Sequence, residues 1–359
     1  MNVSVVGTGL IGGSVGLAAR RAGHRVTGFD RDPASTDGAI RSGAIDRACV
    51  SLAEACSGAD LVVLCAPVGA VVSLLDDPAL QRVTGVVTDV SSTKADIVAA
   101  GSSRIGARFV GGHPMAGSER HGIEAADGRL FEDAWWILTP THATDPVAYK
   151  VVSEFVSGLG AKPVAIEPDA HDELLARLSH LPQLVAAAVV AVAAGSGSSR
   201  SLLGLAAGGF RDVTRIAASQ PEMWIDILAT NRRSILEALT DLQGELDGLR
   251  EALETSHWDG LRTRLETARK TRLEAFAKPD VPADSVLLSL LVPDRPGVLA
   301  EVTTAAGELG ANIEDIQIFH STEGGRGRLE LVVAGVGPAQ RLEDRLTSLG
   351  YHVDRGVPG

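Results

Sequence analysis

The chain has 359 residues, with 33 basic and 45 acidic side chains and a formal net charge of −12. This length predicts two or three domains, each large enough for its own core. The acidic balance argues against a nucleic-acid partner, so an anionic ligand must be bound by individual arginine or histidine side chains.

The three cysteines, Cys49, Cys56 and Cys65, form neither a CxxC motif nor a metal-ligand spacing. We therefore expect reduced thiols and no metal site. The chain starts directly with a predicted strand, so we expect no signal peptide, and the apolar stretch 184–194 is too short to cross a bilayer. These features predict a soluble, cytoplasmic protein without a membrane partner.

The first predicted elements are a buried strand over residues 2–6 and a glycine-rich turn. Gly7, Gly9 and Gly12 form GxGxxG, and Leu10 and Ile11 begin a helix of small apolar residues. In this motif the first glycine makes the tight turn and the second lets the backbone approach a pyrophosphate. The third allows close packing of helix on strand, so that the helix N-terminus faces the phosphates.

A second predicted strand, 25–29, ends at Asp30, where a carboxylate can accept a hydrogen bond from a ribose 2′-hydroxyl. The order strand, GxGxxG, helix, strand, acid predicts a dinucleotide site and favours NAD. The neighbouring Arg31 leaves NADP open, because a guanidinium can bind a 2′-phosphate.

Short apolar runs alternate with helical patterns up to about residue 167, which is typical of a doubly wound sheet. Ligand groups in such sheets collect at the carboxyl ends of the strands. Those ends carry the glycine motif and Asp30, and further along the chain Ala66-Pro67, Ser91-Ser-Thr-Lys94 and His113-Pro-Met-Ala-Gly117. We expect these segments to form the floor of an active site.

Three later motifs carry candidate catalytic and binding side chains. His113 ends a predicted strand, and an imidazole can accept a hydroxyl proton while a hydride leaves the same carbon. His180 stands in SHLP, and Arg211 and Arg215 lie one helical turn apart in GGFRDVTR, where a guanidinium can hold a carboxylate. Taken singly, His113 also fits an ordinary loop residue, and the two arginines also fit a solvated helix face.

From about 168 to 278 the strand pattern gives way to helices. Leucine and isoleucine recur with a heptad-like spacing from Ile235 to Leu253, and Trp258, Leu261 and Leu265 continue the pattern after a break near 255–256. This predicts a helical hairpin with one long apolar face. We interpret the face as a subunit interface, with packing inside one chain as the alternative, and expect a homodimer.

After a linker at 278–283, the pattern strand, helix, strand, strand, helix, strand fills residues 284–359 and predicts a ferredoxin-like βαββαβ unit. The expected fold is therefore α/β. It comprises a Rossmann-like doubly wound domain over 1–167, an all-helical dimerisation domain over 168–278 and the βαββαβ domain over 284–359.

The order of GxGxxG, Asp30, DVSSTK, GGHPMAGSE, SHLP and GGFRDVTRIA resembles the prephenate/arogenate dehydrogenase family over essentially the whole chain. The segment containing PDRPGVLA and GANIE resembles an ACT domain. The resemblance implies NAD-dependent oxidative decarboxylation of a small cyclohexadienol, prephenate, to 4-hydroxyphenylpyruvate in tyrosine biosynthesis.

The resemblance also implies roles for individual residues. His113 would accept the proton of the substrate 4-hydroxyl, and Ser92 would hydrogen-bond the same hydroxyl. Arg215 would hold a substrate carboxylate and His180 would lie near the substrate side chain. Further substrate positions would be Glu119, Gly208, Asp212 and Trp224. The cofactor positions would be Gly7, Gly9, Leu10, Ile11, Gly12, Asp30, Arg31, Ala66 and Pro67. An aromatic amino acid, tyrosine or phenylalanine, would bind the ACT-like unit at Asp294, Gly297, Val298, Leu299, Asn312 and Ile313.

Three alternatives stay open. Arogenate carries an amino group where prephenate has a keto group, and the neutral Gln183 beside SHLP favours prephenate because it cannot pair with an ammonium. Another NAD-linked hydroxyacid dehydrogenase would carry a catalytic lysine in the helical domain, but residues 168–269 contain none. A non-catalytic amino-acid sensor would not need Ser92, His113 and Arg215 together.

Overall fold

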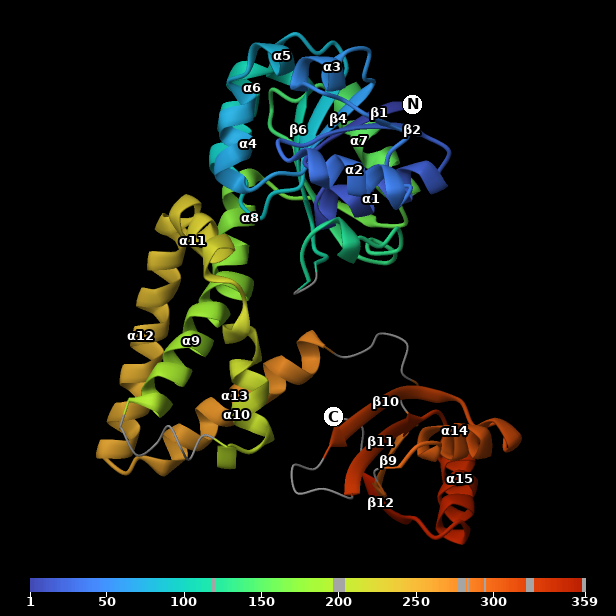
Figure 1. Cartoon of the computed structure of the whole chain (residues 1–359). Helices are drawn as coiled ribbons and strands as arrows, with labels where there is room; N and C mark the ends of the chain where they lie inside the picture. Colours follow the sequence, from blue (N-terminus) through green and yellow to red (C-terminus); the bar gives the residue numbers. More distant parts are fainter. Residues whose placement is uncertain are drawn as a thin grey trace. The chain divides into compact units, whose positions relative to one another are not determined.

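The computed structural model describes residues 1–117, 120–195, 204–276, 282, 284–293, 295–320 and 326–356. It divides into two compact units, residues 1–246 and 247–359, and the boundary falls within one long helix. Figure 1 labels the elements of both units.

An eight-stranded sheet forms the centre of the first unit, in the order β3-β2-β1-β4-β5-β6-β7-β8. The six strands from β3 to β6 run parallel, whereas β7 is antiparallel to β6 and β8 is parallel to β7. The doubly wound sheet is thus confirmed, with two reversed strands at one edge. The strands are β1 Asn2–Val6, β2 Arg25–Phe29, β3 Arg47–Ala48, β4 Leu61–Leu64, β5 Val86–Asp89, β6 Phe109–Pro114, β7 Trp135–Thr139 and β8 Lys162–Ala165.

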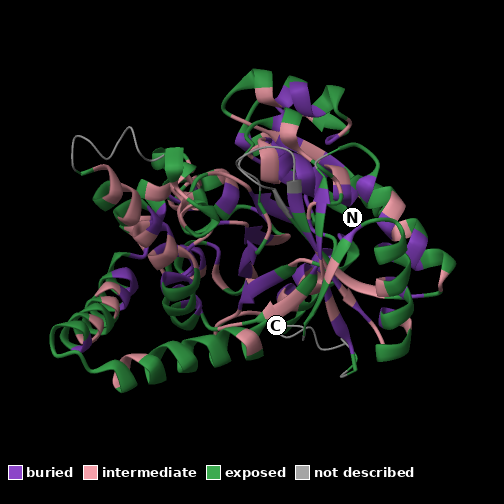
Figure 2. Ribbon diagram, turned by 90° about the horizontal axis from the view of Figure 1, so that it is seen from below, coloured by how far each residue is buried: buried purple, intermediate pink, exposed green. Residues whose placement is uncertain are grey.

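Helices cover both faces of this sheet because neighbouring side chains of a strand point to opposite sides. On β1, Val5 packs into one apolar cluster with α1 and α7, and Val6 packs into a second cluster with α4 and α6. Figure 2 shows the buried strands between their more exposed helices. The helices are α1 Leu10–Arg21, α2 Pro33–Arg41, α3 Leu52–Cys56, α4 Val68–Leu75, α5 Pro78–Gln81, α6 Ala95–Arg104 and α7 Pro146–Gly158, with short 3-10 turns at Gly106–Arg108 and Ile123–Ala125.

The remainder of the first unit is helical. A helix α8, Pro168–Leu175, runs through a π-helical turn, Ala176–His180, into α9, Leu181–Ala194. The elements that follow are α10 Gly208–Thr214, a 3-10 turn Arg215–Ala218, α11 Pro221–Thr230 and α12 Arg232–Glu254, which crosses into the second unit.

The continuous helix Pro168–Ala194 corrects one expectation. Its 27 residues are long and apolar enough to cross a membrane by length and composition alone, and only 28% of the apolar window is buried. The sequence pattern underestimated its length because Pro182 does not end it: this proline closely follows the π-helical turn Ala176–His180. Much of its apolar surface is therefore not buried by the part of the chain that the structure describes.

The predicted apolar seam lies on α12 and on α13, Trp258–Ala275, and the break falls at 255–257 as expected. Ile235 is buried, but Leu246 and Leu253 on α12 are 53% and 56% exposed. Trp258 and Leu265 on α13 are 60% and 61% exposed. Among the described residues, only the first part of the seam is therefore packed.

The second unit also contains the expected βαββαβ domain. Its antiparallel sheet has the order β10-β11-β9-β12, and α14 and α15 supply Val302 and Leu342 to the core it forms with Leu288 and Leu331. The elements are β9 Val286–Pro293, α14 Val298–Glu308, β10 Ile313–His320, β11 Arg326–Val333, α15 Val336–Ser348 and β12 His352–Gly356.

Candidate active site

The glycine-rich turn between β1 and α1 has the geometry of a diphosphate cradle. Gly7 has φ +94°, and a Cβ built there would lie 2.4 Å from the Cys65 carbonyl oxygen. A Cβ on Gly12 would lie 1.8 Å from the Gly7 carbonyl oxygen, so the helix and the turn are in direct backbone contact. A Cβ on Gly9 would meet no atom of the described residues within 4 Å, and no side chain caps the N-terminus of α1 there. The turn therefore leaves room and free amide groups for an anion.

The end of β2 forms a second part of this cradle. Asp30 accepts hydrogen bonds from the Thr8 amide at 2.8 Å and the Asp32 amide at 3.0 Å, which fix the carboxylate. Asp30 and Arg31 line a cavity of about 340 Å³ together with Gly7, Gly9, Ala66 and Pro67. These residues fit the ribose and diphosphate of a dinucleotide.

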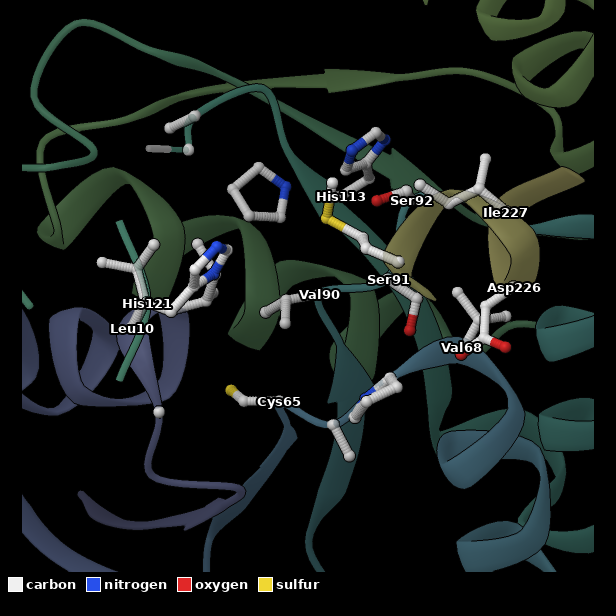
Figure 3. A pocket seen from close by; sticks show the side chains of 18 of the residues that line it. Leu10, Cys65, Val68, Val90, Ser91, Ser92, His113, His121, Asp226 and Ile227 are labelled. Atoms are coloured by element: carbon white, nitrogen blue, oxygen red, sulfur yellow. The ribbon is translucent and has the colours of Figure 1, made fainter. Parts of the chain in front are cut away.

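A larger cavity of about 560 Å³ shares Gly9, Cys65, Ala66 and Pro67 with the first. It brings together the ends of β4, β5 and β6, the N-terminus of α1 and one face of α11 (Figure 3). The predicted site residues that line it are Gly9, Leu10, Ile11, Ala66, Pro67, Ser92 and His113. Burial raises the pKa of the Cys65 thiol, so this cysteine stays protonated and is no nucleophile.

His113, at the end of β6, is 9% exposed and sits in a chain of buried side chains. Its Nδ1 lies 2.9 Å from His171 Nε2, and His171 Nδ1 lies 2.8 Å from Asp172 Oδ1. Burial sets the pKa of His113 well below the usual histidine value, and positive charge on His171, Lys94 or His180 would lower this pKa further. The imidazole is therefore neutral and able to accept a proton.

A buried ion pair supports the backbone beside His113. Lys94 donates to Asp89 and, at 2.8 Å, to the Gly112 carbonyl, while Asp89 accepts from the Gly112 amide at 3.1 Å. Both side chains are fully buried. Burial lowers the pKa of Lys94, and the adjacent carboxylate of Asp89 opposes that shift.

Other predicted substrate residues do not line this cavity among the described residues. His180 is 1% exposed; its Nδ1 accepts from Asn231 Nδ2 at 3.2 Å, and its ring meets Trp224 edge-on at 6.1 Å. Burial lowers the pKa of His180 to about 4. Gly208 and Asp212 are exposed on α10, and Arg215 is exposed in the 3-10 turn that follows it. Glu119 lies outside the described residues.

Sequence reasoning named Trp224 on α11, but missed that this helix forms a wall of the cavity through Glu222 and Asp226. Their i, i+4 spacing was a usable signal, because it places two carboxylates on one helix face. Sequence reasoning also missed the support behind His113. His171 and Asp172, near the start of α8, gave no such signal. Among the described residues, no group of three or more histidine, cysteine or acidic side chains is placed to hold a metal ion.

The βαββαβ domain has its own small cavity, about 130 Å³, lined by β9, α14, β10 and β11. Val298 and Leu299 line it beside Arg295, whereas Asn312 and Ile313 do not. Gly297 has φ +90° and begins α14 without a side-chain cap. Asp294 lies outside the described residues.

Comparisons with known protein families agree with this architecture. Residues 15–165 match the family model described as prephenate dehydrogenase, nucleotide-binding domain, and residues 167–267 match the prephenate dehydrogenase dimerization domain. Residues 286–350 match the ACT domain.

Individual relatives point the same way. The chain is 35% identical to the prephenate dehydrogenase of Bacillus subtilis over 338 residues, 92% of this chain and 91% of that protein. It resembles the A. aeolicus prephenate dehydrogenase solved with hydroxyphenyl propionate and NAD+, with a TM-score of 0.72 and 33% identity over 77% of this chain and 98% of that one. It also resembles Synechocystis arogenate dehydrogenase, with a TM-score of 0.68 and 32% identity over 77% and 100% of the two chains.

Proposed function

The chain belongs to the prephenate dehydrogenase family, and we propose that it catalyses the NAD-dependent oxidative decarboxylation of prephenate to 4-hydroxyphenylpyruvate in tyrosine biosynthesis. The observation that carries this proposal is the position of His113. A buried, neutral imidazole lines the same cavity as the glycine-rich turn. A proton acceptor is thus available next to a site suited to a dinucleotide.

NAD fits the residues of this chain. The open side of Gly9 and the uncapped N-terminus of α1 would hold the diphosphate, and the fixed carboxylate of Asp30 would accept from a ribose hydroxyl. Leu10, Ile11, Ala66 and Pro67 would border it. When bound, NAD supplies the acceptor for the hydride of the substrate C4.

His113 would manage the proton of this reaction. Its imidazole accepts the proton of the 4-hydroxyl as that carbon becomes a ring ketone. Breaking the bond between the ring and its carboxylate releases CO2 and leaves its electron pair in an aromatic ring, with negative charge on the ring oxygen. His113 then returns its proton to that oxygen, so the reaction consumes and releases no net proton. Ser92, in the same cavity, would orient the hydroxyl.

The family resemblance assigns the substrate carboxylates and side chain to other residues. We propose that Arg215 holds a carboxylate and that His180 lies towards the substrate side chain. Glu119, Gly208, Asp212 and Trp224 complete the set that the resemblance implies. An Arg215→Ala variant is expected to raise KM for prephenate far more than it lowers kcat, because the guanidinium binds the ground state and the transition state alike.

One observation favours arogenate as a second candidate substrate. Glu222 and Asp226 place two carboxylates in the cavity, and a carboxylate can pair with the ammonium of arogenate. Against this, Gln183 beside His180 is buried and neutral. Initial rates with prephenate and arogenate, each with NAD and NADP, separate the candidates. We expect kcat/KM to be highest for prephenate with NAD by at least tenfold, whereas a higher value for arogenate would overturn the assignment.

We further propose the quaternary and regulatory organisation. The family model for residues 167–267 is a dimerization domain, and the exposed seam on α12 and α13 supports a homodimer formed through residues 168–278. The domain boundaries would be 1–167, 168–278 and 284–359, in a cytoplasmic enzyme. The ACT domain would bind an aromatic amino acid, tyrosine or phenylalanine, at the turn before α14. A chain lacking 280–359 whose tyrosine response is unchanged would contradict that role.

A further inference from the structure

His113 is backed by two side chains that do not themselves line the cavity among the described residues. His171 is fully buried and Asp172 is 3% exposed, and both lie on α8. The three side chains form one line: His113 Nδ1 to His171 Nε2 at 2.9 Å, and His171 Nδ1 to Asp172 Oδ1 at 2.8 Å. Each ring nitrogen in this line therefore acts as a donor or an acceptor according to its neighbour.

The carboxylate at the end of the line determines these roles. Asp172 Oδ1 accepts from the Lys94 amide at 2.8 Å, and Oδ2 accepts from the Ala95 amide at 2.9 Å, at the N-terminus of α6. Both oxygens are thus occupied by N–H donors, which favours the ionised carboxylate, an acceptor only. The second contact of Oδ1 must then also be a donor, so His171 carries its proton on Nδ1.

The tautomer of His171 in turn determines the tautomer of His113. A neutral His171 with a proton on Nδ1 has a lone pair on Nε2, which accepts. His113 Nδ1 must therefore donate to it, and in a neutral imidazole this leaves Nε2 of His113 without a proton. This is the nitrogen that remains to face the cavity.

We propose that His171 and Asp172 are positioning residues that hold His113 as its Nδ1–H tautomer, with Nε2 free to accept the substrate hydroxyl proton. The proposal rests on the proposed function of His113 and extends it. Without this line, the Nε2–H tautomer would place a hydrogen where the base must accept one. In serine proteases an aspartate bonded directly to the catalytic histidine fixes its tautomer, whereas here His171 lies between the aspartate and the base.

The line also stabilises His113 after the proton has arrived. The imidazolium keeps its Nδ1–H on His171, and the negative charge of Asp172 lies one ring further away. Positive charge on Lys94 or His180 opposes the protonation of His113. Asp172, bonded to His171, supplies negative charge that stabilises the transient imidazolium, as do Asp89 beside Gly112 and the two carboxylates of α11 in the cavity.

A residue of the junction between α11 and α12 holds α8 in place. Asn231, between α11 and α12, donates to the backbone carbonyl of Asp172 at 2.7 Å and to His180 Nδ1 at 3.2 Å. The helical part of this unit thus holds the line against the end of β6.

Nitrogen-15 NMR of the full chain, labelled at histidine, tests the tautomer directly. The His113→Asn variant assigns the His113 signals, and His142→Asn, in an exposed loop, serves as a control with unchanged activity. We expect wild-type His113 and His171 both to be protonated on Nδ1 and bare on Nε2 at pH 7.5. A His113 protonated on Nε2 would overturn the proposal, whether or not prephenate proves to be the substrate.

Kinetics of two His171 variants provide the second test. His171→Leu removes the acceptor and should lower kcat by about 10- to 100-fold, which corresponds to one lost hydrogen bond to a charged group. KM for prephenate and Kd for NAD should change little. His171→Gln keeps an oxygen that can accept from His113 and should recover most of the lost kcat. A His171→Leu enzyme within threefold of the wild-type kcat, or equal losses in both variants, would refute a positioning role.

Discussion

Replacing Lys94 by methionine should destabilise the first unit strongly, because it breaks a fully buried ion pair. Met keeps most of the apolar length of the side chain but removes the partner of Asp89 and the donor to the Gly112 carbonyl. Asp89 retains the amides of Ser91, at 2.9 Å, and Gly112, at 3.1 Å, so its charge remains buried and only partly compensated. Removing one member of a buried pair costs about 3–5 kcal/mol.

Thermal unfolding followed by circular dichroism measures this effect. For a domain of this size, about 4 kcal/mol corresponds to a fall in Tm of roughly 8–16 °C. The matched control is Lys150→Met, which removes an exposed i, i+4 pair with Glu154 at 3.7 Å and should cost about 0.5 kcal/mol or less. A Lys94→Met protein within 1 kcal/mol of wild type would show that the pair is not needed to hold the end of β6.

Three further outcomes follow from the dinucleotide cradle and from the buried His180. Gly9→Ala should raise Kd for NAD at least tenfold without changing Tm. Gly12→Ala should instead lower Tm, because its Cβ would lie 1.8 Å from the Gly7 carbonyl oxygen. Equal effects of the two variants on Kd and Tm would count against the cradle. Asp30→Ser should lower the ratio of kcat/KM with NAD to kcat/KM with NADP at least tenfold. A wild-type enzyme that already prefers NADP would contradict this. Acid should destabilise the fold, because the pKa of His180 is about 4 when folded and about 6.5 when unfolded. The unfolded chain then binds more protons between these pH values, so His180 alone lowers the free energy of unfolding by up to about 3 kcal/mol as pH falls from 6.5 to 4. A Tm that stays constant over this range would refute the prediction.

Local patterns predicted the parts of the site that are built from consecutive residues. The glycine motif, Asp30 and Ser92 each follow a strand, and His113 lies at the end of one. Parallel strands bring their carboxyl ends to one edge of a sheet. Their arrangement around adjoining cavities therefore followed from the order of elements. The ACT-like unit was predictable for the same reason, since its alternation of strands and helices is regular.

Contacts between segments that are distant in the sequence could not be predicted from local patterns. His171 meets His113 across 58 residues of sequence, and only the packing of α8 against the end of β6 makes them neighbours. The antiparallel pairing of β7 with β6 was not predicted, because the sequence between them carries no periodic signal. Arg215 shows the opposite case: its motif is specific, yet it does not line the described cavity.

The central claim is that His113 accepts the substrate proton during oxidative decarboxylation, and the products formed by wild type and His113→Asn test it most directly. Wild type with prephenate and NAD should give NADH, CO2 and 4-hydroxyphenylpyruvate in equal amounts. The variant should bind NAD with unchanged Kd but lose about 10²- to 10⁴-fold in kcat. A His113→Asn enzyme that forms the same products at a near-normal rate would contradict the account.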